Sequence, residues 1–550
     1  MKKLLLGAAI SAALFGGAAQ AAITLNAGKV VVEPANTYEI YLSGASAALD
    51  YIEQLAISTS VIAADRMCDS TAPIFKFKDN GGGKDQNAYA CTLNPLNPQL
   101  VGLAAGKTNL VIYKRSVGGS ALGVTPIIDD AKGASTASIA FLNVDPAVCT
   151  VPTPTPAAGV LSTSTCTYSA TTVGQFQNHK PDFGISDVDP VQFSGANTPS
   201  GFAPVTSSDV NFLNVESAGG QVFGIGATLK LRNALQEAQF ATTSTCNPTN
   251  AGYTTGLVGT AESAACQPNM TRDQIASIIS GKLDSWKDLK IGTSDLYTAT
   301  STANKPGSAN ARVHICTRTN GSGTKAQLGI NFLNYPCSTV ATAPTADTGS
   351  TTTAGVYSFL TEVVAKTQVH ALSSSGTVSE CLGEMNSGTN TVGTAFPNPY
   401  TSARWAIGVQ GLEKNAGLTE NWRFVKIDGV APTLENVAKG KYHDWAELTF
   451  QYSKTHVWDT SEDLIVKEFI KAAGNPSVMV SLNAANKQTF GDSGYLASPK
   501  NFPADVNGNF VSTYPVNPYS HATASEAVNN CRIPTAYDLT TNPASGVQLQ

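Results

Sequence analysis

Charged residues are scarce in this chain. Only 14% of the residues are Asp, Glu, Lys or Arg, and 35 basic residues stand against 40 acidic ones. The net charge of −5 excludes a broad basic surface of the kind that binds nucleic acid or an anionic membrane. A binding site for an anion must therefore be local. Ser, Thr, Asn and Gly supply most of the polar character, which favours an extracytoplasmic protein.

Long apolar runs are also lacking, apart from one near the start. Three residues, Met1 to Lys3, precede an apolar run from Leu4 to about Phe15, and small residues follow as far as Ala21. The run is shorter than the roughly 20 residues that span a bilayer, and the pattern is that of a secretory signal peptide. We predict a signal peptide over 1–21 and a mature chain in the periplasm or at the cell surface, without a membrane span.

Patterns for metal ligation are missing. The ten cysteines form no C-x-x-C and the six histidines are scattered, which argues against a zinc site. An even number of cysteines in an exported chain instead predicts disulfides. Four neighbouring pairs flank short loops, and elimination leaves one further pair. The predicted disulfides are Cys68–Cys91, Cys149–Cys166, Cys246–Cys266, Cys316–Cys337 and Cys381–Cys531.

Strand patterns and helix patterns alternate along the chain. Alternating residues at 38–42 give way, after a Gly/Ser turn, to a helical period over 47–55. A strand at 311–315 likewise runs into a glycine-rich loop and a helix that extends through Phe332. This order predicts an α/β class, and the length predicts at least two cores.

Three tracts interrupt these patterns. Each is rich in Thr, Ser, Ala, Pro or Gly and poor in large apolar residues, so it can contribute little core. The tracts are Val151–Thr172, Ala241–Glu262 and Ser338–Gly355. We interpret them as insertions, and the predicted disulfides beside them as staples.

Four loops place hydroxyls and glycines where a strand hands over to a helix or a turn. A helix N-terminus presents unpaired N–H groups and a partial positive charge, so such loops can bind anions. Each loop alone is a weak signal. The four are Gly44-Ala45-Ser46, Gly118-Gly119-Ser120, Asp182-Phe183-Gly184-Ile185-Ser186-Asp187 and Arg318-Thr319-Asn320-Gly321-Ser322-Gly323-Thr324.

In this order, the loops resemble those of the periplasmic phosphate-binding protein of bacterial ABC transporters. Three further segments are similar to that family: 274–288, which ends in G-K-x-x-x-W-x-D, the A-I-G strand at 406–409, and the G-V-x-P-T-x-E-N segment within 427–442. The resemblance implies a type II periplasmic binding protein fold, with two α/β lobes joined by a hinge. It places one lobe at 22–220 and 402–550, and the other at 221–401.

The resemblance also implies a function. Inorganic phosphate or a similar oxyanion would lie between the lobes, without a cofactor, a catalytic residue or a metal. The partner would be an ABC permease and the protein would act as a monomer. The implied phosphate ligands are Ser46, Ala47, Ser120, Asp187, Arg318, Ser322, Gly323 and Thr324.

Asp187 is the discriminating residue in this set. A protonated phosphate offers a hydrogen-bond donor to the carboxylate, whereas sulfate offers only lone pairs and repulsion. Leaving a buried charge unpaired in this way costs several kcal/mol. Arg318 can bind an oxyanion through two parallel hydrogen bonds. We therefore expect selectivity for phosphate over sulfate.

The sequence departs from the family at two positions and admits two other readings. Ala47 stands where the family commonly has an aromatic residue, and Asn320 where it often has an acid.

The residues from Ser322 to Lys325 also fit S-x-x-K, the serine acyl-enzyme pattern, but no K-T-G or S-D-N accompanies it. The stronger alternative is a secreted surface or matrix protein that uses this fold for phosphate capture or partner contacts outside transport.

Overall fold

A computed structural model gives the three-dimensional structure. The predicted signal peptide lies outside the residues that it describes. Two of the interpreted insertions also run partly beyond them. The described residues are 23–57, 61–79, 86–101, 103, 107–167, 176–307, 311–353, 356–362, 366–388, 399–456, 459–500, 502–505, 509–522, 527–537 and 547–548.

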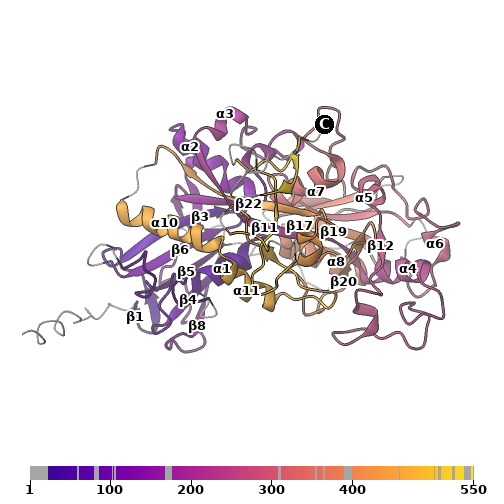
Figure 1. The fold of residues 1–550 in the computed structure, drawn as a ribbon, viewed down its shortest axis with the longest axis horizontal. Coiled ribbons are helices and arrows are strands. Elements are labelled where there is room, and N and C mark those ends of the chain that lie inside the picture. Colours follow the sequence, from indigo (N-terminus) through magenta and orange to yellow (C-terminus); the bar gives the residue numbers. More distant parts are fainter. Residues whose placement is uncertain are drawn as a thin grey trace, which may run out of the picture.

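One thirteen-stranded mixed sheet runs through the molecule (Figure 1). Helices pack against it, so the predicted α/β class is confirmed. Its first half, the first lobe, contains neighbouring parallel strands at its centre and antiparallel strands at both sides. These strands are β3 (Thr37–Gly44), β4 (Ile74–Asp79), β5 (Gln86–Thr92), β6 (Asn109–Arg115), β8 (Leu161–Cys166), β10 (Phe183–Ser186), β22 (Trp445–Ser453) and β23 (Tyr495–Leu496).

The second half of the sheet, the second lobe, is smaller. Its strands lie in the order β18, β15, β19 and β11, and β20 pairs with β11. They are β15 (His314–Arg318), β18 (Gln368–Leu372), β19 (Ala406–Gly411) and β20 (Trp422–Phe424). The helices of this lobe are α4 (Leu229–Gln239), α5 (Arg272–Ile279), α6 (Leu296–Ala299), α7 (Gly323–Leu333) and α8 (Ser375–Ser387). Thr271 caps α5 through a capping box with Gln274.

Strand β11 (Leu213–Thr228) joins the two lobes. Its first part, residues 213–222, pairs with β22, and its last part, residues 223–227, pairs with β19. A bulge between Ser217 and Gly219 interrupts the register. In Figure 1 the labels of β11 and β22 lie at the centre, between the indigo strands of the first lobe and the red and orange elements of the second. A single long strand thus serves both lobes.

Three helices cover one face of the first lobe. They are α1 (Leu49–Ile57), α10 (Thr460–Ala473) and α11 (Pro476–Ala485). Their buried residues Ile52, Phe469 and Met479 share one apolar cluster with Leu42 of β3. The remaining short elements are β1 (Thr24–Asn26), β2 (Lys29–Val31), β7 (Ile139–Leu142), β9 (Phe176–His179), β12 (Asn269–Met270), β13 (Lys290–Ile291), β14 (Ser294–Asp295), β16 (Ser350–Thr353), β17 (Val356–Phe359), β21 (Lys426–Ile427), β24 (Tyr519–Ser520), β25 (Arg532–Ile533), β26 (Thr535–Ala536), β27 (Val547–Gln548), α2 (Thr125–Ala131), α3 (Ser207–Val210) and α9 (Leu434–Ala438).

The chain returns to the first lobe later than the predicted boundary at residue 402. Strand β19 pairs with β11 and lies parallel to β15, and β20 also pairs with β11, so both belong to the second lobe. All six residues of β19 are buried, which is typical of an interior strand rather than a connection. The return occurs between β21 and β22.

Three of the five predicted disulfides are confirmed: Cys68–Cys91, Cys149–Cys166 and Cys246–Cys266. The other two predicted pairings are wrong. Cys316 bonds Cys381, because α8 packs on β15 and brings the two cysteines together. Cys337 bonds Cys531, which reaches it from the far end of the chain. Pairing each cysteine with its neighbour in the sequence therefore gave the wrong disulfide where a helix or a long connection lay between the true partners.

The tract Val151–Thr172 supplies structure as well as loop. Strand β8 lies within it and extends the sheet by pairing in parallel with β4. Ser162 and Ser164 of β8 are buried, so the expectation that this tract contributes little to the interior is only half correct. The disulfide Cys149–Cys166 fixes the end of the strand.

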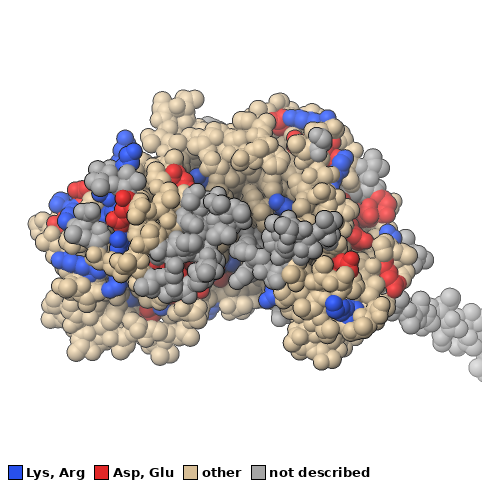
Figure 2. Space-filling view, turned by 180° about the vertical axis from the view of Figure 1, so that it is seen from behind, with Lys and Arg blue, Asp and Glu red and all other residues tan. Residues whose placement is uncertain are grey.

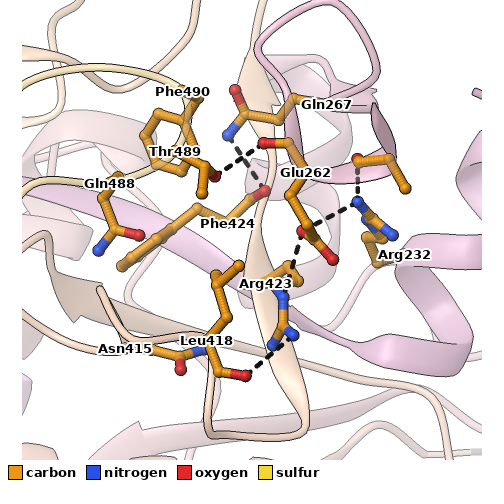
Figure 3. Close-up of a pocket in the computed structure, with 11 residues that line it drawn as sticks. Arg232, Glu262, Gln267, Asn415, Leu418, Arg423, Phe424, Gln488, Thr489 and Phe490 are labelled. Atoms are coloured by element: carbon orange, nitrogen blue, oxygen red, sulfur yellow. Dashed lines mark hydrogen bonds and ion pairs between the residues drawn. The ribbon is translucent and has the colours of Figure 1, made fainter. Parts of the chain in front are cut away.

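Buried ion pairs anchor the tract Ala241–Glu262. The Glu262 carboxylate lies between the guanidinium groups of Arg232 and Arg423, at 3.1 and 3.3 Å (Figure 3). The cavity beside them measures about 10 Å³. That is room for about one water molecule, so we regard this pocket as part of the framework rather than as a ligand site.

Asp444 lies where the chain re-enters the first lobe, just before β22. Its Oδ1 accepts hydrogen bonds from Gln327 and Asn331 of α7, whereas its Oδ2 has no partner among the described residues. Burial raises the pKa of this carboxyl to about 6. The folded protein therefore binds this proton more tightly than the unfolded chain does, and the stability that it contributes is lost as the pH rises from about 4 to 6.

We predict that Asp444→Asn removes this pH dependence. A shift of about two pKa units corresponds to about 3 kcal/mol of unfolding free energy between pH 4 and pH 7. Urea unfolding of the variant should lose that part of the slope, while the exposed control Asp288→Asn should keep the wild-type profile. A variant whose profile matches that of the wild type would contradict the assignment.

Candidate oxyanion site

Three of the four predicted loops lie at one edge of the sheet. Strands β3, β6 and β10 are parallel neighbours, so the loops that follow them leave from the same side. In α/β sheets, ligands bind outside the carboxyl ends of such strands. The fourth loop follows β15 in the second lobe and meets them there, as the contacts below show.

Glycines allow the second loop to lie directly on the strands. A Cβ at Gly184 would lie 1.8 Å from the carbonyl oxygen of Gly123, and one at Gly44 would lie 1.9 Å from that of Ile185. Gly44 also has φ of 118°, which side chains disfavour. The short helix η1 (Ser120–Gly123) therefore packs backbone to backbone on β3 and β10. Because of this contact, the hydroxyl of Ser120 accepts a hydrogen bond of 3.3 Å from the backbone N–H of Asp187.

Asp187 is buried between the two lobes, with 1% of its surface exposed. Its Oδ2 accepts a hydrogen bond of 3.0 Å from the hydroxyl of Thr324, which belongs to the second lobe. Its Oδ1 has no hydrogen-bond partner among the described residues. Burial raises the pKa of this carboxyl above its usual value, and the charge of Arg318 opposes that rise. The unpartnered oxygen can accept one further donor.

The start of α7 contacts both Ser120 and Asp187. Ser322 caps the helix by accepting a hydrogen bond from the N–H of Lys325. A Cβ on Gly323 would lie 2.5 Å from the Ser120 hydroxyl and 2.8 Å from Cβ of Asp187, so the approach requires glycine. The N–H groups of a first helical turn are not used within the helix. Those of Gly323 and Thr324 thus lie beside the carboxylate of the first lobe.

Arg318 ends β15 and is buried, with 1% exposed. Its guanidinium donates to the carbonyl oxygens of Leu372 and Ser373 and to the hydroxyl of Ser375, so it is fixed in place. Its positive charge is the first of the effects that hold down the pKa of Asp187. Arg318 therefore acts on Asp187 through its charge, while its hydrogen bonds go to the second lobe.

Lys114 is a residue that the sequence reading missed. It lies near the end of β6 and is 1% exposed. Its ammonium donates to the carbonyl of Gly44 at 3.1 Å and to the hydroxyl of Ser116 at 3.1 Å, and its charge also lowers the pKa of Asp187. Lys114 follows four apolar residues of β6 and precedes Arg115, so its sequence context gives no sign that it is buried. Two buried cations thus act on one buried carboxylate.

The first loop lies beside this cluster, at the end of the neighbouring strand. The hydroxyl of Ser46 is buried and has no hydrogen-bond partner among the described residues. Ser46 precedes α1 rather than capping it, and its carbonyl accepts from Leu49. Ala47 is fully buried, and its carbonyl accepts from Gln221 and Tyr495. The structure therefore brings Ser120, Asp187, Arg318, Ser322, Gly323 and Thr324 together, while the hydrogen bonds that Ser46 and Ala47 accept come from other residues.

Two further sequence features now have a place. Asn320, at the position where an acid was expected, accepts a hydrogen bond of 2.7 Å from the ammonium of Lys325. The hydroxyl of Ser322 accepts the backbone N–H of that lysine, as a helix cap does. In the part of the chain that the structure describes, no cluster of three His, Cys, Asp or Glu residues suits a metal ion.

The outer surface carries no concentrated charge on the face that Figure 2 shows. Lysine and arginine side chains are interspersed with acidic ones there, and most of the face is uncharged. Among the described helices, none is both long and apolar enough to cross a membrane. Two positive charges, those of Lys114 and Arg318, lie buried inside the molecule.

Comparisons with solved structures found matches of low identity and low TM-score. The structure is similar to one described as a phosphate ABC transporter substrate-binding protein with bound phosphate from Clostridium perfringens, at 12% identity over 82% of this chain and 98% of that one, with a TM-score of 0.35. An ABC-type phosphate transport receptor from Vibrio cholerae matches at 13% identity over 55% and 78%, with a TM-score of 0.27. An ancestral soluble variant of the human phosphate binding protein matches at 11% over 83% and 90%, with a TM-score of 0.35.

No family model and no curated protein matches the sequence. TM-scores and identities this low do not establish a shared ligand. The case for an oxyanion therefore depends on the residues of the site itself.

We predict that Gly323→Ala disrupts the contact between the lobes. The added methyl group would meet Ser120 and Asp187 at distances that force one of them to move, at a cost of roughly 1–3 kcal/mol in unfolding free energy. Gly383→Ala, in α8, is a matched control because its Cβ would meet nothing within 4 Å. That control should be neutral or more stable by up to about 1 kcal/mol. Equal effects in urea unfolding would contradict the close packing at Gly323.

Proposed function

We propose that this protein binds a protonated oxyanion, inorganic phosphate, between its two lobes. The observation that carries the proposal is Asp187, a carboxylate buried between the lobes with one oxygen that accepts no hydrogen bond from the described residues. An acceptor buried in this way is costly unless a donor reaches it. Phosphate at neutral pH still carries a proton that it can donate.

The charges around Asp187 favour an anionic ligand as the molecule that supplies this hydrogen-bond donor. Lys114 and Arg318 are both buried and both act on this carboxylate, and the N-terminal end of α7 adds partial positive charge. Buried positive charge of this kind attracts an anion.

Binding requires the lobes to part first, because Thr324 and Asp187 contact each other directly. On closure, we expect the hydroxyl of Thr324 to donate to a phosphate oxygen instead, together with Ser120 and the first amides of α7. The hydroxyl of the protonated phosphate would then donate a hydrogen bond to Oδ1 of Asp187. Charge-assisted hydrogen bonds of this kind are about twice as strong as neutral ones. Sulfate has no proton to offer at this pH.

The setting of this activity follows from the sequence features. A signal peptide and five disulfides fit a protein that works outside the cytoplasm. We propose that the protein is a periplasmic monomer that delivers phosphate to an ABC permease. The tract 241–262, on the second lobe, is an elaboration that a minimal binding protein would not need.

Titration calorimetry on phosphate-stripped protein tests the proposal. We expect about one phosphate to bind per chain, and sulfate to bind roughly a hundredfold or more weakly, because a buried carboxylate left facing lone pairs costs several kcal/mol. The same titration at the same ionic strength with sulfate is the control. No heat with phosphate, or equal affinity for sulfate, would refute phosphate as the ligand.

We predict that Asp187→Asn relaxes selectivity more than it weakens binding. An amide can donate to sulfate, so the ratio of the phosphate and sulfate affinities should fall by at least about tenfold. Asp189→Asn is a matched control, since Asp189 is also buried but its oxygens already accept from Gln192 and Asn530. That control should keep the wild-type ratio. An unchanged ratio in the Asp187 variant would remove this residue from the role of discriminator.

A second function has one observation in its favour. The apolar cluster of the second lobe continues into the first, since Ala121 and Val188 belong to the same cluster as Ala326 and Ile330 of α7. Lobes packed in this way suit a permanently closed body. The alternative is therefore a secreted surface or matrix protein that holds its lobes together and uses its added loops for partner contacts. A protein that binds neither anion in the titration would support it.

A further inference from the structure

The C-terminal part of the chain lies across both lobes. After α11, the Gln488 amide donates to the carbonyls of Leu412 and Lys414, at 3.0 and 2.8 Å, which follow β19 in the second lobe. The hydroxyl of Thr489 donates to the carbonyl of Glu262 at 2.8 Å (Figure 3). Strand β23 then pairs with β11 at residues 220–221. This segment therefore begins in the first lobe and fastens to the second.

The same segment is next fixed to the first lobe. The hydroxyl of Ser520 donates to the carboxylate of Glu447, which lies on β22. Further along, the N–H and the side-chain amide of Asn530 donate to Oδ1 of Asp189, at 2.7 and 3.1 Å. Asp189 follows β10, two residues after Asp187. The position of Asn530 is thus set by the first lobe, beside the loop that carries the discriminating carboxylate.

A disulfide then joins this position to the second lobe. Cys531 bonds Cys337, which follows α7, and the sequence separation of the two cysteines is 194 residues. Helix α7 packs on β15 and β19 of the second lobe. Of the five disulfides, the other four connect residues within one lobe. Cys337–Cys531 therefore bridges the two lobes covalently, on the side where α7 meets the first lobe.

Hydrogen bonds between the lobes surround this bridge. The carbonyl of Gly321 accepts from the N–H of Ala121 at 2.8 Å, and the N–H of Gly321 donates to the carbonyl of Asn197 at 3.1 Å. The side chain of Asn197 donates to the carbonyl of Ser322 at 3.3 Å. The hydroxyl of Tyr335, two residues before Cys337, accepts from the N–H of Ala196. We call these contacts and the disulfide the clasp.

We propose that the clasp restrains the opening of the lobes and so controls access to the oxyanion site. Non-covalent contacts can open and close, whereas the bond between Cys337 and Cys531 keeps α7 close to the loop after β10 in every open state. The lobes can then part only by a limited rotation about this tether and β11. The inference concerns the site of the proposed function, but the restraint itself acts whether or not phosphate binds.

The double variant Cys337→Ser/Cys531→Ser tests the restraint directly. In phosphate-free buffer we expect a larger radius of gyration in X-ray scattering than for the wild type. We also expect amide hydrogen exchange at residues 321–324 to be faster by about tenfold or more, because local opening is easier. Cys246→Ser/Cys266→Ser is the matched control, since it removes a disulfide within the second lobe. It should change neither quantity.

A milder variant keeps the test decisive if the double variant does not fold. Tyr335→Phe removes one hydrogen bond of the clasp and leaves the disulfide in place. Exchange at residues 321–324 should then be faster than in the wild type, and where both variants fold it should be slower than in the double variant. Unchanged exchange and an unchanged radius in the variants that fold would overturn the restraint.

The effect on the ligand is measured separately. If the protein binds phosphate, release of radiolabelled phosphate should be faster in Cys337→Ser/Cys531→Ser than in the wild type. The control Cys246→Ser/Cys266→Ser should release it at the wild-type rate. If the protein binds no phosphate, the proposed function fails, while the scattering and exchange results still decide the restraint. Faster opening with an unchanged release rate would overturn the control of access.

Discussion

The contact between Thr324 and Asp187 is the interaction on which the rest of the site depends. It joins the first turn of α7 in one lobe to a buried carboxylate in the other. Burial makes the charged form of Asp187 costly, so Arg318 and Lys114 must lie nearby to sustain it. In the function that we propose, this carboxylate, with one oxygen that accepts no hydrogen bond from the described residues, would distinguish a protonated oxyanion from an unprotonated one.

Close packing of backbone makes this contact attainable. Gly123 and Gly184 lie against each other in the first lobe, and Gly323 lies against Ser120 and Asp187 from the second. No side chain could be added at these points without moving a neighbour. The long strand β11 holds the two halves of the sheet in one frame, and the Cys337–Cys531 disulfide ties them at the side of α7. The site is thus bounded by rigid elements on each side.

The predictable features were those set by local rules. Capping at Thr271, the helix after the glycine-rich loop at Arg318 and the strand at Ala406 all follow from patterns within a few residues, and the structure confirms them. Lys114 escaped notice because a lysine in a strand has no local signature of burial. The pairing of Cys337 with Cys531 escaped it because a connection of that length leaves no spacing rule to apply.

The sequence by itself determined the α/β class, the export signal that we infer, and the residue types of an oxyanion site at the ends of strands. Alternation, glycine turns and helix caps are local, so they can be read from the order of residues. Only the tertiary structure decided which loops meet, that Lys114 joins them, and that a disulfide crosses between the lobes. Those outcomes depend on contacts between residues 67 to 194 positions apart, whose distances no local pattern encodes.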